Sequence, residues 1–258
     1  MDPGLRTPLI DFFRRGEVAR DVRLMAAQGA LAPRAHEQLA LLVLLSDDSD
    51  PDIARATAET LAALPEQPLR AFLARSDVPD EIRRFFASRG VESGGVAAAD
   101  SEEPLIDTLA ELADVPEDTA GAEAERKPLS SLPVIDRIKL AMKGTREQRG
   151  QLVRDSNKLV AAAVLSSPKL TDSEVEAFTK MGNVTEDVLR IIGMNRAWTK
   201  NYGVIAGLCR HPKTPPAISM QMLNRLHERD LKMLAIDRNV PEGLRALARK
   251  VATKAKQG

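Results

Sequence analysis

Asp237–Lys250 reads DRNVPEGLRALARK, and Arg75–Arg89 reads RSDVPDEIRRFFASR. Both stretches place valine, proline and an acid just before an apolar residue. Variants of the same phrase begin at Val184 (VTEDV) and at Thr214 (TPPAI), and a truncated copy begins at Val115. Proline suits the first turn of a helix because its missing N–H would have no partner there, and an acid beside it faces the positive end of the helix dipole. The phrase therefore predicts a helix N-terminus, called a helix entrance below, wherever it recurs.

Composition points to the same kind of structure. Of the 258 residues, 43% are apolar, chiefly Ala, Leu, Val and Ile, and only 3% are aromatic. Apolar residues recur at helical spacing, as at Ile218, Met222 and Leu226, whereas clean alternation with period two is scarce. Thr171 and Glu174 have the spacing of a capping box, in which side chains satisfy two free N–H groups. We therefore predict an all-α fold.

The second half of the chain divides into short helical segments, with Ser167-Pro168 and His211-Pro212 at helix ends. Helices this short cannot bury a face alone, so neighbours must stack on one another. We expect helices at residues 134–142, 146–154, 157–166, 172–180, 186–193, 198–210, 216–226, 229–236 and 242–254.

Three regions follow from these patterns. Residues 1–89 are expected to form an N-terminal helical repeat unit of four or five helices, and residues 132–258 a C-terminal helical repeat domain. Between them, residues 90–131 are rich in small, polar and acidic residues, which predicts a flexible linker. Leu105, Leu109 and Leu112 within it could line one side of a short amphipathic helix or docking peptide.

Charge separates the two halves, although the formal net charge of the chain is zero. Residues 1–126 contain 13 arginines, no lysine and 25 acids, a net charge of −12, and residues 127–258 have a net charge of +12. Residues 91–126 alone contribute −10. Three interpretations stay open: a feature that keeps the protein soluble, a basic domain for an acidic partner, or an acidic linker that masks this domain.

Targeting and redox signals favour the cytoplasm. The first residues lack a basic segment followed by an apolar stretch, so no secretory start is expected. The longest apolar run, Leu39–Leu45, is too short to span a bilayer, which makes membrane association unexpected. The single cysteine, Cys209, excludes an internal disulfide framework.

The phrases SPKLTDSEV, GNVTEDVL, HPKTPPAI and RNVPEGL resemble those of bacterial HEAT-like and leucine-rich-repeat-variant α-solenoids. The resemblance covers most of residues 132–258 and, more weakly, residues 1–89. It implies an irregular α-solenoid. Members of the wider HEAT-like class mostly bind other proteins on an extended surface, some bind nucleic acid, and a few are enzymes.

Residues that could support catalysis are few. The three histidines, His36, His211 and His227, have no metal-ligand spacing, and no phosphate-binding loop is present. Cys209 and His211 could form half of a metal site, but without a second pair we interpret them as a buried apolar residue and a helix-end residue. The acidic run SDDSDPD around Asp50 lacks the glycine of a calcium loop and predicts a turn and helix cap. No catalytic residue, metal site, cofactor or small-molecule substrate is predicted.

One stretch, NRAWTKNYGVIAGLCRHPK, gathers the only tryptophan and the only tyrosine among basic residues. Trp198 and Tyr202 are four residues apart and would share one face of the expected helix. Aromatic rings among cations can stack on nucleic-acid bases. They can equally be core or groove residues whose polar atoms contact solvent. The candidate binding residues are Arg196, Trp198, Lys200, Tyr202, Arg210 and Lys213.

These observations favour a non-enzymatic interaction scaffold that presents a basic helical surface to a protein or other acidic partner. The alternative is a nucleic-acid-binding HEAT-like module that uses the same surface. A HEAT-like enzyme is a third hypothesis, although the aromatic pocket with a catalytic acid of HEAT-like glycosylases is not recognisable here.

Overall fold

The computed structural model describes residues 7–32, 34–94, 104–106 and 128–254. Within these ranges every regular element is a helix, and no strand occurs, so the predicted all-α class is confirmed. Most of the predicted linker, residues 95–103 and 107–127, lies outside the described residues. The truncated phrase at Val115 and most of the expected amphipathic helix lie there too.

The chain forms two compact units. Unit 1 comprises residues 1–145 and 162–168, and unit 2 comprises residues 146–161 and 169–258. Residues 132–145 and 162–168, which were predicted to be part of the C-terminal domain, thus belong to unit 1.

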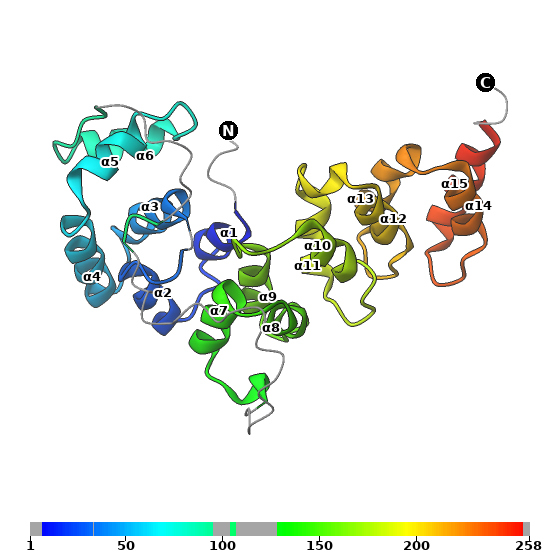
Figure 1. Cartoon of the computed structure of the whole chain (residues 1–258), viewed down its shortest axis with the longest axis horizontal. Coiled ribbons are helices and arrows are strands. Elements are labelled where there is room, and N and C mark those ends of the chain that lie inside the picture. The colour runs from blue at the N-terminus through cyan, green and yellow to red at the C-terminus, as the bar shows by residue number, and fades with distance from the viewer. Residues whose placement is uncertain (1–6, 33, 95–103, 107–127, 255–258) are drawn as a thin grey trace. The chain divides into compact units, whose positions relative to one another are not determined.

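Unit 1 is organised around α3 (Ala35–Leu45), which contacts α1, α2, α4 and α6 (Figure 1). The sequence AHEQLALLVLL is apolar on nearly all sides, as expected for a helix at the centre of a core. The other helical elements of unit 1 are α1 (Pro8–Arg14), α2 (Arg20–Ala27), α4 (Pro51–Ala62), α5 (Glu66–Leu73), α6 (Asp80–Ala87), the 3-10 helix η2 (Leu129–Ser131), α7 (Val134–Lys143) and the second half of α9 (Lys158–Leu165).

The acidic run before α4 is a turn and a cap, as predicted. Asp50 is the N-cap of α4, and its carboxylate accepts a hydrogen bond from the Asp52 N–H at 3.0 Å. Asp48 in turn accepts from the Asp50 N–H at 2.9 Å. Arg20 and Arg23 of α2 form ion pairs with this turn and thereby hold α2 beside α4.

Unit 2 is a succession of short helices in two rows. α10 contacts α12, which contacts α14; α11 contacts α13, which contacts α15. Figure 1 shows these helices following one another along unit 2. The elements are α8 (Arg146–Leu152), the first half of α9 (Lys158–Leu165), α10 (Asp172–Phe178), α11 (Glu186–Met194), η3 (Trp198–Lys200), α12 (Tyr202–Arg210), α13 (Pro216–Met222), η4 (Leu223–Arg225), α14 (Glu228–Ile236) and α15 (Glu242–Lys254).

The repeated phrase forms the same local structure at each described copy. Helices α6, α11, α13 and α15 all begin at the third residue of their phrase. The first residue is buried in every copy, and its N–H donates to the carbonyl three residues earlier at 3.1 to 3.5 Å. These first residues are Val78, Val184, Thr214 and Val240. The prediction of a repeated helix entrance is thus confirmed, because each copy contains both the turn and the residue that anchors it.

The capping box before α10 is also present. The Thr171 hydroxyl accepts from the Glu174 N–H, and the Glu174 carboxylate accepts from the Thr171 N–H at 3.1 Å. Glu174 does more than cap the helix, because its buried carboxylate also pairs with Arg149 of α8 at 2.9 Å. This ion pair joins α8 to α10, two helices that are in contact.

Candidate functional site

The six candidate binding residues lie along the stretch from the end of α11 to the turn before α13. Arg196 and Lys200 are exposed on either side of Trp198, which is half-buried in η3. Tyr202 begins α12, Arg210 ends it, and Lys213 is exposed in the following turn. All six therefore belong to unit 2.

The expected single helix over residues 198–210 is wrong. Its first residues form η3, and the chain is extended at Asn201 (φ −73°, ψ 123°) before α12 begins. Trp198 and Tyr202 consequently do not share one face of a continuous helix.

Two asparagine side chains explain this break. Asn195 Oδ1 accepts from the backbone N–H groups of Ala197 and Trp198, and Asn201 Oδ1 accepts from the Gly203 N–H at 2.8 Å. Such local bonds offer the backbone an alternative to the helix. The two asparagines were the sequence signal for the interruption, and apolar spacing alone missed it.

Tyr202 and Arg210 meet at a residue that sequence reasoning did not single out. The Tyr202 hydroxyl donates to the carboxylate of Asp230 in α14, and the Arg210 guanidinium forms an ion pair with the same carboxylate. The Tyr202 hydroxyl also accepts from the His227 N–H at 3.1 Å. The Tyr202 and His227 rings stack, with centroids 4.3 Å apart and planes inclined by 30°. One end of α14 is therefore joined to both ends of α12.

The electrostatics of this cluster keep the phenol protonated. Burial is the main factor that raises the pKa of Tyr202, and the hydrogen bond to Asp230 raises it further. A phenol with a raised pKa is a hydrogen-bond donor and a poor general base. The cluster is thus suited to holding a fixed polar surface.

A hollow of about 410 Å³ lies beside this cluster. Tyr202 and Arg210 line it together with Glu176, Lys180 and Asp230. Gly203 and Gly207 form part of its wall, where α12 approaches α10 so closely that a Cβ on either glycine would collide with Glu176 or Thr179. The other four candidate residues do not line the hollow.

Cys209 and His211 have structural positions. Cys209 is fully buried, and burial raises the pKa of its thiol to about 12, so it is not a thiolate at neutral pH. His211 is the C-cap of α12, as expected for a helix-end residue. Its Nδ1 accepts from the Lys213 N–H at 3.1 Å, and its Nε2 lies 3.1 Å from the Met181 carbonyl oxygen. Both ring nitrogens are thereby occupied within the protein.

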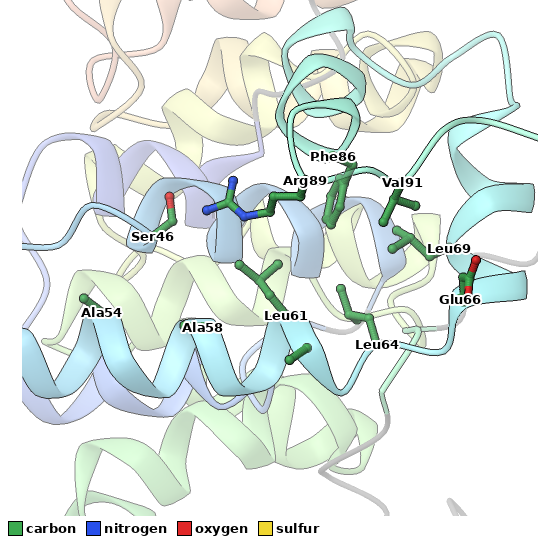
Figure 2. Close-up of a pocket in the computed structure, with 11 residues that line it drawn as sticks. Ser46, Ala54, Ala58, Leu61, Leu64, Glu66, Leu69, Phe86, Arg89 and Val91 are labelled. Carbon is green, nitrogen blue, oxygen red and sulfur yellow. The ribbon is translucent and has the colours of Figure 1, made fainter.

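Unit 1 contains a second hollow, of about 480 Å³ (Figure 2). Leu61 of α4 and Leu64, which follows that helix, project into it, with Leu69 and Phe86 opposite. Figure 2 places the Arg89 guanidinium near Ser46, at the end away from Glu66. Its walls are chiefly apolar, with one cation and one carboxylate, so it offers apolar contact and little chemistry for a reaction.

Within the described ranges, no group of three or more His, Cys, Asp or Glu side chains could hold a metal ion. In the same part of the chain, no helix is long and apolar enough to cross a membrane. Comparison with protein-family models, with curated proteins and with solved structures finds no match to this chain.

Proposed function

We propose that unit 2 is a non-enzymatic interaction module, of the HEAT-like α-solenoid type, that presents a basic surface to an acidic protein partner. The two rows of short helices and the repeated entrances support the solenoid interpretation, because each helix packs on its neighbours along the row. A cytoplasmic location belongs to the same proposal.

The observation that carries the proposal is a surplus of unpaired cations. Unit 2 has 20 basic and 11 acidic residues. Seven of its carboxylates already form ion pairs with its own lysines and arginines: Glu174, Glu176, Glu186, Asp187, Glu228, Asp230 and Glu242. Nine exposed basic side chains make no ion pair with the described residues: Arg146, Arg154, Arg196, Lys200, Lys213, Arg225, Arg229, Arg238 and Lys250. Such cations are available to carboxylates of another molecule.

Exposed apolar residues in the same unit favour a protein over a nucleic acid as partner. Met194, Met220, Met233 and Ile236 are exposed, and Met194 and Ile236 retain more than two thirds of their accessible surface, at 71% and 73%. Methionine and arginine are both enriched in protein–protein interfaces. A surface that combines the two residue types matches an acidic protein segment with apolar side chains.

The cluster around Tyr202 and His227 also favours a protein partner over a nucleic acid. Tyr202 already stacks on His227 and donates its hydroxyl to Asp230, so one face of its ring and its hydroxyl are engaged within unit 2. Two carboxylates, Glu176 and Asp230, line the adjacent hollow and pair there with Lys180 and Arg210, so these two cations are not available to a phosphate. Trp198, between Arg196 and Lys200, is the residue that would favour the nucleic-acid alternative.

Fluorescence polarisation with the full chain tests the proposal, using a labelled polyglutamate peptide and a mixed-sequence single-stranded DNA as probes. The double variant Arg196→Glu with Lys200→Glu should weaken peptide binding at least about tenfold, as expected when two attractive contacts become repulsive. The control, Arg14→Glu with Arg84→Glu, makes the same change in net charge on exposed residues of unit 1 and should have a much smaller effect.

Equal losses in the two double variants would show that net charge alone governs binding and would overturn the proposed surface. Tighter binding of DNA than of peptide, with a steep linear fall of log affinity against log salt, would favour the nucleic-acid module instead. Absence of binding to both probes would count against a basic interaction surface of either kind.

A further inference from the structure

A buried side-chain amide in unit 1 binds the backbone of a distant segment. Gln38 of α3 is 1% exposed. Its Nε2 donates to the Ile106 carbonyl oxygen at 2.7 Å, and its Oε1 accepts from the Ile106 N–H at 3.1 Å. The two residues are 68 positions apart. Gln38 therefore holds both backbone polar groups of a single residue.

The surrounding structure presents the amide in this orientation. α2 is followed by Gly29 in the left-handed region (φ 79°), a conformation that glycine adopts without strain. The Gly29 carbonyl oxygen accepts the second N–H of the Gln38 amide at 3.0 Å. One donor is thus used to fix the amide, while the other donor and the oxygen are directed at Ile106.

The amide would lose two hydrogen bonds if residues 104–106 left. A buried polar group without a partner is unfavourable, so this position favours an occupant. The N–H and C=O of Ile106 both reach one carboxamide, which can donate from its nitrogen and accept at its oxygen. The contact recognises peptide backbone, and the aliphatic residues Leu105 and Ile106 accompany it, both half-buried.

We propose that Gln38 is the centre of a binding site for a short peptide with an aliphatic residue, and that residues 104–106 are its tethered, exchangeable occupant. In Figure 1 this short coloured segment lies beside α3. The tether holds the occupant at a high effective concentration, so a competing peptide must be in excess or bind more tightly. The proposal concerns unit 1 and is independent of the function proposed for unit 2.

A labelled peptide with the sequence of residues 102–108, EEPLIDT, is the probe. It should bind saturably to a chain, called the emptied chain, in which Pro104→Gly, Leu105→Ser and Ile106→Gly remove the aliphatic contacts of the tethered segment and so weaken its hold on Gln38. Binding to the wild-type chain should be at least about tenfold weaker, because the tethered segment competes. Gln38→Glu in the emptied chain should reduce binding at least about tenfold, since a carboxylate cannot donate to a carbonyl oxygen. Gln67→Glu, the same change at an exposed position of α5, should leave binding unchanged.

A second probe separates backbone recognition from a general effect on folding. The same peptide with an N-methyl group on the isoleucine nitrogen lacks the N–H that Gln38 accepts, and it should bind the emptied chain at least about tenfold more weakly. Equal binding of both peptides, or no binding to an emptied chain that circular dichroism shows to be folded, would overturn the proposal.

Hydrogen exchange of the wild-type chain provides the test if the emptied chain does not fold. Excess unlabelled peptide should accelerate exchange at the Ile106 amide while the amides of α3 stay protected. Unchanged protection at Ile106 under saturating peptide would show that the segment is a permanent part of unit 1.

Discussion

Helix α3 of unit 1 and helix α14 of unit 2 are buried in different ways. α3 is covered on nearly every side by four neighbouring helices, and its sequence shows almost no polar face. α14 buries Leu231, Leu234 and Ala235 but exposes Met233 and Ile236. Unit 1 therefore depends on one central helix, whereas unit 2 distributes its core over many small contacts between neighbours. The comparison indicates that damage should spread through unit 1 but stay local in unit 2.

The exception in unit 2, and the largest expected effect, is the buried ion pair between Arg149 and Glu174, whose side chains are 1% and 3% exposed. Glu174→Ala leaves the Arg149 guanidinium buried without this partner and should lower the free energy of unfolding by about 3–5 kcal/mol. Urea denaturation measures this loss in the free energy of unfolding. As a control, Glu186→Ala, which removes an exposed pair with Arg190, should cost less than about 1 kcal/mol. Similar losses in the two variants would show that burial does not distinguish these pairs.

Leu42→Ala in α3 and Leu234→Ala in α14 compare the two units directly, because both side chains are fully buried. Each should cost about 2–5 kcal/mol. Hydrogen exchange should show loss of protection throughout α1–α4 and α6 for Leu42→Ala. For Leu234→Ala the loss of protection should be confined to α14, α15 and their immediate neighbours. Uniform loss across unit 2 would contradict the distributed core.

Acid should weaken unit 2 through the same buried carboxylate. Burial alone would raise the pKa of Glu174, but hydrogen bonds from Arg149 and Thr171 outweigh it and hold the pKa below the ordinary value of 4.5. The unfolded chain then takes up this proton first, so the stabilisation is present above the ordinary pKa and is lost as pH falls through the folded one. The slope for one group is at most about 1.4 kcal/mol per pH unit.

Urea midpoints measured between about pH 6 and pH 3 check this prediction. The fall in stability should be shallower in Glu174→Gln, which cannot titrate at this position. Parallel curves for the wild type and the variant would assign the acid sensitivity to other carboxylates.

The smallest expected effect concerns the break before α12. Asn201→Ala removes the side-chain cap of the Gly203 N–H and should cost about 1 kcal/mol. Thermal denaturation measures the loss. Asn224→Ala, an exposed asparagine in η4, is the control and should change stability by less than about 0.5 kcal/mol. A stabilised Asn201→Ala variant would show that η3 and α12 can merge without cost.

Local features account for what could be predicted. The phrases at Val78, Val184, Thr214 and Val240 each contain their own turn and helix start, and the helices begin where the phrases predict. Thr171 and Glu174 form the expected cap because both groups lie within one turn of backbone. The wrong prediction of one helix over residues 198–210 also has a local cause. Apolar spacing predicts a continuous helix there, but the side chains of Asn195 and Asn201 bind nearby backbone N–H groups and interrupt it.

The candidate site was predictable only in part. Tyr202 and Arg210 were named from an aromatic residue among cations, but their common partner Asp230 lies 28 and 20 positions away. No spacing rule connects α12 with α14, so the contact could not be read from the chain. Cys209 and His211 were predictable as a buried residue and a helix-end residue. A free cysteine is usually buried, and Pro212 directly follows His211.

The sequence by itself determined the helical class, the entrances of the helices and the opposite charges of the two halves, because propensity, capping and composition act over a few residues. Only the tertiary structure decided which buried polar groups meet: Arg149 with Glu174, Asp230 with Tyr202 and Arg210, and Gln38 with Ile106. A buried polar group must be satisfied wherever folding brings a partner within about 3 Å. That partner is set by the packing of helices, which links residues far apart in the chain.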